Sequence, residues 1–140
     1  MSNAQFVAQI NAFVDKANGN VELVARKIAL DVFKRVVRKT PVDTGRAKGN
    51  WQATYGSPAS GEVGYVDRTK RGNISAPRER DLASTALAWN PAESSIFLTN
   101  NLPYIGRLEN GSSDQSPAGM VKVTLAEYPG IVEVNARGVE

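Results

Sequence analysis

The segment from Val21 to Lys39 constrains the fold most, because it predicts a helix with two apolar faces. One broad stripe at helical spacing comprises Val21, Val24, Ala25, Ile28, Ala29, Val32 and Val36. A second stripe comprises Leu23, Leu30, Phe33 and Val37, and the polar sector comprises Lys27, Asp31, Lys34 and Arg38. A helix with one apolar stripe lies on a surface, whereas a helix with two stripes needs a cover on both sides. Thr40-Pro41 should end this helix, since the residue before a proline disfavours helical dihedral angles.

A first helix should precede this segment and could provide one of the covers. Ser2 and Gln5 fit a capping box. The apolar stripe that follows comprises Phe6, Val7, Ile10, Phe13, Val14 and Ala17. Asn18-Gly19-Asn20 should separate the two helices, with Gly19 just after the end of the first. A sheet is the second expected cover, and a neighbouring subunit is the alternative on either side.

Beyond Pro41 the sequence predicts short strands. The stretch 42–45 has turn chemistry, because Asp43 can bond its own backbone and Gly45 accepts a positive φ. A strand is expected at 50–55, where Trp51, Ala53 and Tyr55 alternate with polar residues. Further strands are expected at 62–66 and at 95–99, the latter as a buried strand.

Three helices are expected in the second half of the chain. Residues 81–89 predict a short helix that Asn90-Pro91 ends, and residues 103–110 predict another. In the latter, Tyr104, Ile105 and Leu108 should face inward, and Arg107 and Glu109 outward. A last helix should begin at Pro117, with Met120, Val121, Thr124, Leu125 and Tyr128 on one face. The alternation of Val121, Val123 and Leu125 leaves a strand as the alternative, and Pro129-Gly130 should break or kink either.

The predicted fold is therefore α+β: N-terminal amphipathic helices on a small, mainly antiparallel sheet, in one domain over residues 1–140.

The residue types limit the chemistry that the chain can perform. There is no cysteine and no histidine among the 140 residues, so disulfides, thiolate metal sites and the commonest general base are excluded. The carboxylates are scattered, and no phosphate-binding, nucleophile-elbow or zinc-binding motif occurs. We expect no enzymatic activity, no cofactor and no metal. We also expect no membrane association, since no apolar run approaches the ~20 residues that span a bilayer.

A basic segment stands out although the net charge is only +3. Its cations are Arg68, Lys70, Arg71, Arg78 and Arg80, with Asp67, Glu79 and Asp81 nearby. Residues 67–80 contain one large aliphatic side chain, Ile74, and therefore predict a mobile loop that buries too little apolar surface to offset its ordering entropy. This basic loop is either a solvated connection or a surface for phosphate or an acidic partner.

Two stretches resemble the neck or tail-completion proteins of long-tailed bacteriophages, the family that includes minor tail protein Z. The first is Thr40-Pro-Val-Asp-Thr-Gly-Arg-Ala-Lys-Gly-Asn-Trp51, which is similar to the family's Pro-x-Asp-Thr-Gly turn followed by a basic residue and a strand. The second is Asn101-Leu-Pro-Tyr-Ile-Gly-Arg-Leu-Glu-Asn-Gly111 followed by Gln115-Ser-Pro-Ala-Gly-Met120, which is similar to the family's Pro-Tyr, Glu-x-Gly and Gln-x-Pro series. The order and spacing cover the chain from about Val21 to Tyr128. The chain departs from the family at Pro129-Gly130, where a longer C-terminal helix is expected.

The resemblance implies a structural virion protein at the head–tail junction, assembled in the host cytoplasm and not an enzyme. Such proteins form rings around the DNA channel, so the implied partners are further copies of the chain, with a hexamer as the usual tail symmetry. Tail terminator and head-connector proteins are the implied neighbours, and double-stranded DNA is a further candidate. The residues implied in structure or subunit contact are Asp43, Thr44, Gly45, Trp51, Pro103, Tyr104, Glu109, Gly111, Gln115 and Pro117. The alternative from the residues alone is a small nucleic-acid-binding protein that uses the basic loop at 68–80.

Overall fold

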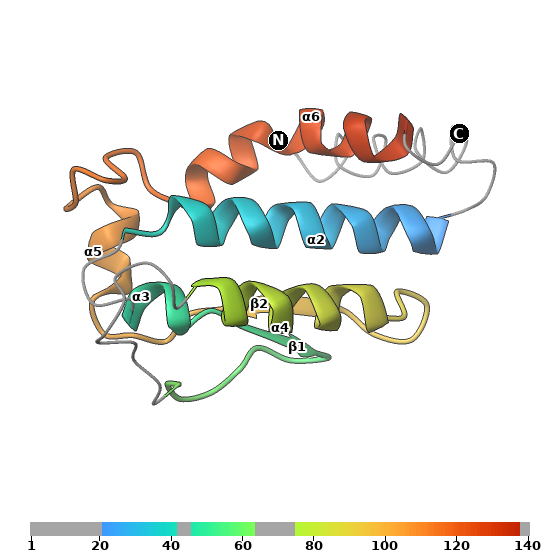
Figure 1. Ribbon diagram of the computed structural model, residues 1–140, viewed down its shortest axis with the longest axis horizontal. Coiled ribbons are helices and arrows are strands. Elements are labelled where there is room, and N and C mark those ends of the chain that lie inside the picture. Colours follow the sequence, from blue (N-terminus) through green and yellow to red (C-terminus); the bar gives the residue numbers. More distant parts are fainter. Residues whose placement is uncertain (1–20, 42–45, 64–74, 138–140) are drawn as a thin grey trace.

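Three long helices and a pair of antiparallel strands form most of the fold in the computed structural model, which describes residues 21–41, 46–63 and 75–137. Helices α6 (Val121–Arg137), α2 (Val21–Lys39) and α4 (Ser75–Ala88) lie side by side, with α2 in the middle (Figure 1). Strands β1 (Gln52–Tyr55) and β2 (Ile96–Thr99) lie beside α4, and the short helices α3 (Arg46–Gly49) and α5 (Ile105–Glu109) gather at one end. The predicted α+β class, with helices packed on a small antiparallel sheet, is confirmed.

Helix α2 has the predicted bounds and is covered on both sides, as its two stripes require. On one side Phe33 and Val37 belong to a core cluster with Leu82 of α4, Trp51 and Met120. On the other side Val24 and Ile28 form a second cluster with Ile131, Val132 and Ala136 of α6. A sheet was expected as one cover, but among the described residues α4 and α6 supply most of the contact with α2. The predicted first helix at 2–17 lies outside the described residues.

The sheet consists of two antiparallel strands among the described residues, close to the predicted ranges 50–55 and 95–99. The register pairs Gln52 with Thr99 and Tyr55 with Ile96. Ala53, Ile96 and Leu98 lie on one face and pack against the core of the helices. A strand at 62–66 is wrong for Glu62 and Val63, which lie in no strand, and residues 64–66 lie outside the described ranges.

Helix α4 begins at Ser75, six residues before the predicted start at 81. The predicted basic loop at 67–80 is therefore wrong for 75–80, so Arg78 and Arg80 lie in a helix. Pro77 is compatible with this helix, because a proline in the first turn removes an N–H that has no helical partner anyway. The helix ends at Ala88, before Asn90-Pro91, as predicted.

The C-terminal segment is helical, so the strand alternative for 121–125 is wrong. Helix α6 begins at Val121 rather than at Pro117, and it continues through Pro129 and Gly130 to Arg137. Its axis changes direction part-way along its length (Figure 1), as expected where a proline removes a helical hydrogen bond. The predicted face is wrong at two positions, because Val121 and Leu125 are 37% and 62% exposed. The C-terminal half supplies the buried residues Ile131, Val132 and Ala136 instead.

Candidate functional site

The two sequence motifs meet at the end of the fold where α3 and α5 lie (Figure 1). Trp51, at the end of the first motif, is buried, and its indole Nε1 donates a hydrogen bond of 2.9 Å to Oγ1 of Thr40. The Thr40 hydroxyl in turn donates to the carbonyl oxygen of Val36 at 2.8 Å. Since Val36 is in the last turn of α2, this chain of bonds ties the start of the first motif to its end and to the central helix.

Three asparagines hold the loops around β1 and β2. Asn50 is fully buried, and its Oδ1 accepts a hydrogen bond of 2.7 Å from the backbone N–H of Val63. Asn100 donates from Nδ2 to the carbonyl oxygen of Ala47 at 2.9 Å, and Asn101 donates to the carbonyl oxygen of Gly61 at 2.9 Å. Asparagine side chains therefore bind the N–H of Val63 and the carbonyl oxygen of Gly61, which a neighbouring strand would otherwise bind. This arrangement is consistent with the absence of a third strand at 61–63.

Arg46 and Tyr104 join the motifs at their surface. The Arg46 guanidinium carbon lies 5.9 Å from the centre of the Tyr104 ring, within the range of a cation–π contact. Arg46 also donates from Nη2 to Oε1 of Glu62 at 2.6 Å. Tyr104 is half-buried, while Pro103 beside it is exposed. The basic residue after the first turn and the tyrosine of the second motif thus form one contact.

Glu109 was predicted to face outward, and this prediction is wrong. Its Oε1 accepts hydrogen bonds from the backbone N–H groups of Met120 at 3.0 Å and Val121 at 2.9 Å. Its Oε2 accepts from the N–H of Lys122 at 2.9 Å. These donors lie at the N-terminus of α6, where helical N–H groups lack a partner and where the helix dipole favours a negative charge.

The environment of Glu109 stabilises its charged form. Partial burial acts to raise the pKa of the carboxyl group, but the N–H donors of Val121, Lys122 and Met120 and the Lys122 charge act against it. The net effect is that the pKa of Glu109 is lowered from its usual value. The glutamate of the Glu-x-Gly motif is therefore a remote cap that fixes α5 to α6.

Two glycines allow the backbone of the second motif to close around Glu109. Gly111 has φ +90°, and a Cβ there would overlap the carbonyl oxygen of Pro117. Gly119 has φ +91°, and a Cβ there would overlap the carbonyl oxygen of Glu109. Gly111 was among the predicted residues, whereas Gly119 was missed. Gln115 and Pro117, also predicted, lie in the exposed connection between these glycines.

A polar seam between α2 and α6 was also missed by sequence reasoning. Asp31 accepts hydrogen bonds from Arg35 at 2.8 Å and from Asn135 of α6 at 2.9 Å. Glu127 of α6 pairs with Arg35 at 3.4 Å and with Lys39. The helix pattern placed Asp31 in the polar sector, but only the position of α6 reveals its partners.

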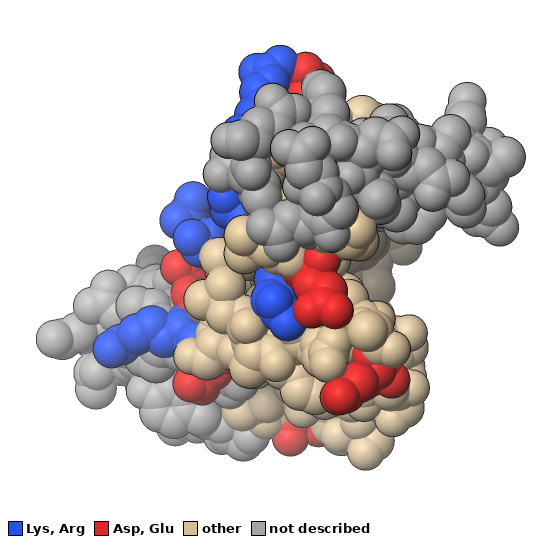
Figure 2. Space-filling view, turned by 90° about the vertical axis from the view of Figure 1, so that its right-hand side faces the viewer, with Lys and Arg blue, Asp and Glu red and all other residues tan. Residues whose placement is uncertain are grey.

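The predicted basic residues are not brought together as a site by the described residues. Arg68, Lys70 and Arg71 lie outside the described ranges, as do Asp43, Thr44 and Gly45 of the first motif. Arg78 lies in the first turn of α4, and Arg80 is exposed on the same helix. Figure 2 shows Lys and Arg interspersed with Asp and Glu on the described part of one face, rather than a continuous basic surface there.

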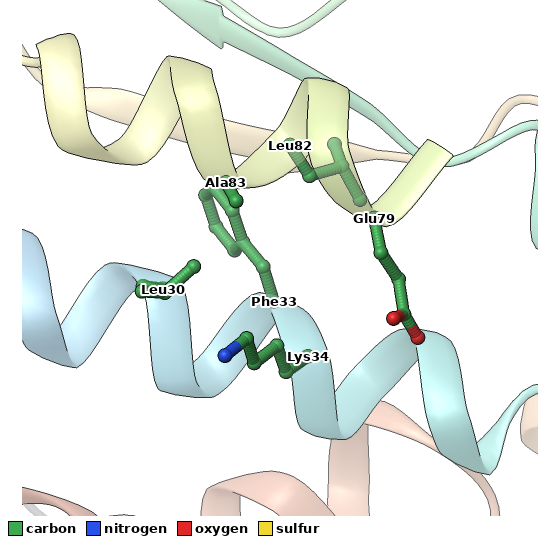
Figure 3. Close-up of a pocket in the computed structure, with 6 residues that line it drawn as sticks. All are labelled: Leu30, Phe33, Lys34, Glu79, Leu82 and Ala83. Carbon is green, nitrogen blue, oxygen red and sulfur yellow. The ribbon is translucent and has the colours of Figure 1, made fainter. Parts of the chain in front are cut away.

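A hollow between α2 and α4 is lined by Leu30, Phe33, Lys34, Glu79, Leu82 and Ala83 (Figure 3). The hollow is too narrow to admit a water molecule. The aliphatic and aromatic side chains fill its centre, with Lys34 and Glu79 at its rim. This hollow is a packing groove between two helices and not a ligand site.

Among the described residues, no group of three or more acidic side chains is placed to hold a metal ion. None of the described helices has the length and apolar character needed to cross a bilayer. No protein-family model, curated protein or solved structure matches this chain.

Proposed function

We propose that this chain is a structural subunit of a tailed-phage virion at the head–tail junction. In this proposal its copies form a ring, most simply a hexamer, around the DNA channel and join the tail to the head connector. The observation that carries the proposal is the contact between the two sequence motifs that resemble the family. They are distant in sequence and lie in contact at one end of the fold, where Arg46 of the first motif lies over the Tyr104 ring of the second.

The interactions of the motif residues favour a structural role rather than a catalytic one. Trp51, Asn50 and Glu109 all use their polar atoms to hold backbone or neighbouring side chains. A subunit of a ring must present a fixed surface to its neighbours, and side chains locked by packing and hydrogen bonds provide one. Pro103, Gln115 and Pro117 lie exposed on this braced end and are the proposed contact residues.

Complementation of particle assembly tests the proposal. Deletion of the gene from the phage that encodes this chain should leave filled heads and finished tails that do not join. Supplying the wild-type chain should restore joined particles. Joined, infectious particles in the complete absence of the chain would contradict a role at the junction.

A DNA-binding assay separates this proposal from the nucleic-acid alternative. Under the proposal, the isolated subunit binds duplex DNA weakly, and replacing Arg68, Lys70 and Arg71 by serine weakens joining or DNA retention in the particle, more so at high salt. Tight binding of the isolated subunit to duplex DNA, with affinity that falls steeply as salt rises, would instead favour the alternative.

A further inference from the structure

The outer side of α6 carries an apolar stripe that no described residue covers. Large side chains on it are Val121, Leu125 and Val134, which are 37%, 62% and 58% exposed. Small or ring-shaped residues, Ala126, Pro129 and Gly130, are also exposed and lie between them. A Cβ built on Gly130 would meet no atom within 4 Å, so this side of the helix is open. Val121 and Val134 lie about 140° apart around the helix, so they form the two edges of this apolar surface, and the other four residues lie between them along the longer arc. An exposed apolar surface of this breadth is unusual for a subunit that remains alone.

Two charged residues lie on the midline of this surface, one toward each end of the helix. Lys122 lies near its N-terminal end, and Glu133 lies near its C-terminal end. Lys122 donates from Nζ to Oδ1 of Asn110, and Glu133 pairs with Arg137 on its own helix. Both charged side chains remain exposed, so each is still accessible to a partner.

The stripe is complementary to itself when a second helix runs antiparallel to it. About the midpoint between Ala126 and Pro129, Lys122 lies opposite Glu133 of the second copy. In the same register Leu125 lies opposite Gly130 of the second copy, where the missing side chain leaves room for it. Because each pair occurs twice, the two-fold arrangement pairs both charges and covers Leu125 of each copy.

The small residues allow close approach of two helices at the centre of the stripe. Ala126 and Gly130 are four residues apart and therefore adjacent on one face of the helix. Small residues at this spacing let two helix backbones pack closely. The long side chains of Lys122 and Glu133 can span the wider gap that forms toward the ends, where the bend in α6 separates the two axes.

We propose that α6 pairs two copies of this chain through an antiparallel, two-fold contact centred between Ala126 and Pro129. One helix face covers less than the ~800 Å² per partner of a standard interface, so the association should be weak and concentration-dependent. The inference does not rest on the proposed ring, since a two-fold contact joins two copies only and a larger ring needs a different, head-to-tail contact.

Disulfide trapping of the full chain tests the register, and the chain has no native cysteine to interfere. Lys122→Cys and Glu133→Cys are prepared separately with different tags, mixed and oxidised, and the second Lys122–Glu133 pair remains intact in the mixed dimer. The mixture should give a covalent heterodimer. Either variant alone should give no covalent dimer, because the two copies of one position lie about 16 Å apart along the axis, beyond the ~7 Å reach of a disulfide. Failure of the mixture to crosslink, or equal crosslinking of a single variant alone, would overturn the register.

Sedimentation over a concentration series tests the contact without introducing cysteine. Leu125→Glu should weaken dimerisation by about tenfold or more, because a buried leucine is replaced by a charge. Leu87→Glu is the matched control, since Leu87 is 54% exposed on α4 and should leave dimerisation unchanged. Glu133→Lys should weaken the dimer about threefold to tenfold, and adding Lys122→Glu should restore it, as expected for exposed ion pairs. A wild-type chain that stays monomeric at every concentration, or a Leu125→Glu variant that associates like wild type, would overturn the contact.

Discussion

Removing the Glu109 carboxylate should destabilise the fold by detaching α5 from α6. In Glu109→Ala, the N–H groups of Met120, Val121 and Lys122 lose their acceptor. Met120 is fully buried, so its N–H cannot be rehydrated, and an unsatisfied buried donor costs about 1–3 kcal/mol. Val121 and Lys122 are exposed, so their loss resembles the removal of a helix cap, at about 0.5–2 kcal/mol. We therefore expect the free energy of unfolding to fall by about 1.5–5 kcal/mol.

Glu109→Gln separates the charge of this cap from its shape. One amide oxygen can still accept from Met120 and Val121, but the amide nitrogen then faces the N–H of Lys122 and repels it. The expected loss at neutral pH is about 1–2 kcal/mol, from one lost bond and the lost charge at a helix N-terminus. Glu93→Gln is the matched control, because this glutamate is exposed between α4 and β2 and should change stability by less than about 0.5 kcal/mol.

The pH dependence of the stability difference between wild type and Glu109→Gln tests whether the charge of Glu109 causes that difference. The pKa of Glu109 is lowered in the folded protein, so its contribution is fully present above the unfolded pKa of about 4.3. It is lost as the pH falls through the lower, folded pKa. Urea unfolding from pH 7 to pH 3 should show the gap between wild type and Glu109→Gln narrowing below about pH 4. A gap that stays constant to pH 3, or a Glu109→Ala variant as stable as wild type, would refute the reasoning.

Three further predictions concern other parts of the fold, each measured by urea unfolding. Gly119→Ala should cost more than Gly56→Ala, by about 1–3 kcal/mol, because both have positive φ but only Gly119 lies against a carbonyl oxygen; equal losses would contradict the contact with Glu109. Ile28→Ala should cost about 2–5 kcal/mol, since Ile28 is 8% exposed and packs against α6; a loss below about 1 kcal/mol would mean that α6 does not cover α2. Trp51→Phe should cost about 1–3 kcal/mol by removing the donor to buried Thr40, and a neutral result would mean that this hydrogen bond does not stabilise the fold.

The sequence was most informative where a long pattern had one structural solution. Helix α2 has the predicted bounds because two apolar stripes and Thr40-Pro41 agree on where it begins and ends. Its covers were less predictable, since the pattern shows that two partners are needed but not which elements reach them. The start of α4 was missed because Pro77 is compatible with both a loop and a first helical turn.

The site was predictable as a set of residues but not as a set of contacts. Glu109 lies on a short helix whose periodicity points it outward, and its actual partner begins eleven residues later in the chain. A capping contact at that distance leaves no local pattern, unlike a capping box within one helix turn. Gly119 lies directly before Met120, and its need for a positive φ is visible only once the carbonyl oxygen of Glu109 is placed. Trp51 was predicted from strand alternation, whereas its bond to Thr40 depends on how the chain turns back between them.

Electron cryo-microscopy of the joined phage particle tests the central proposal most directly. The reconstruction should contain a closed ring of this chain between the head connector and the tail, with the DNA channel along its axis. The layered arrangement of α6, α2 and α4 should be recognisable in each subunit, and the end formed by α3 and α5 should contact a neighbouring protein. A junction whose density is fully explained by other proteins, with no copy of this fold, would contradict the account.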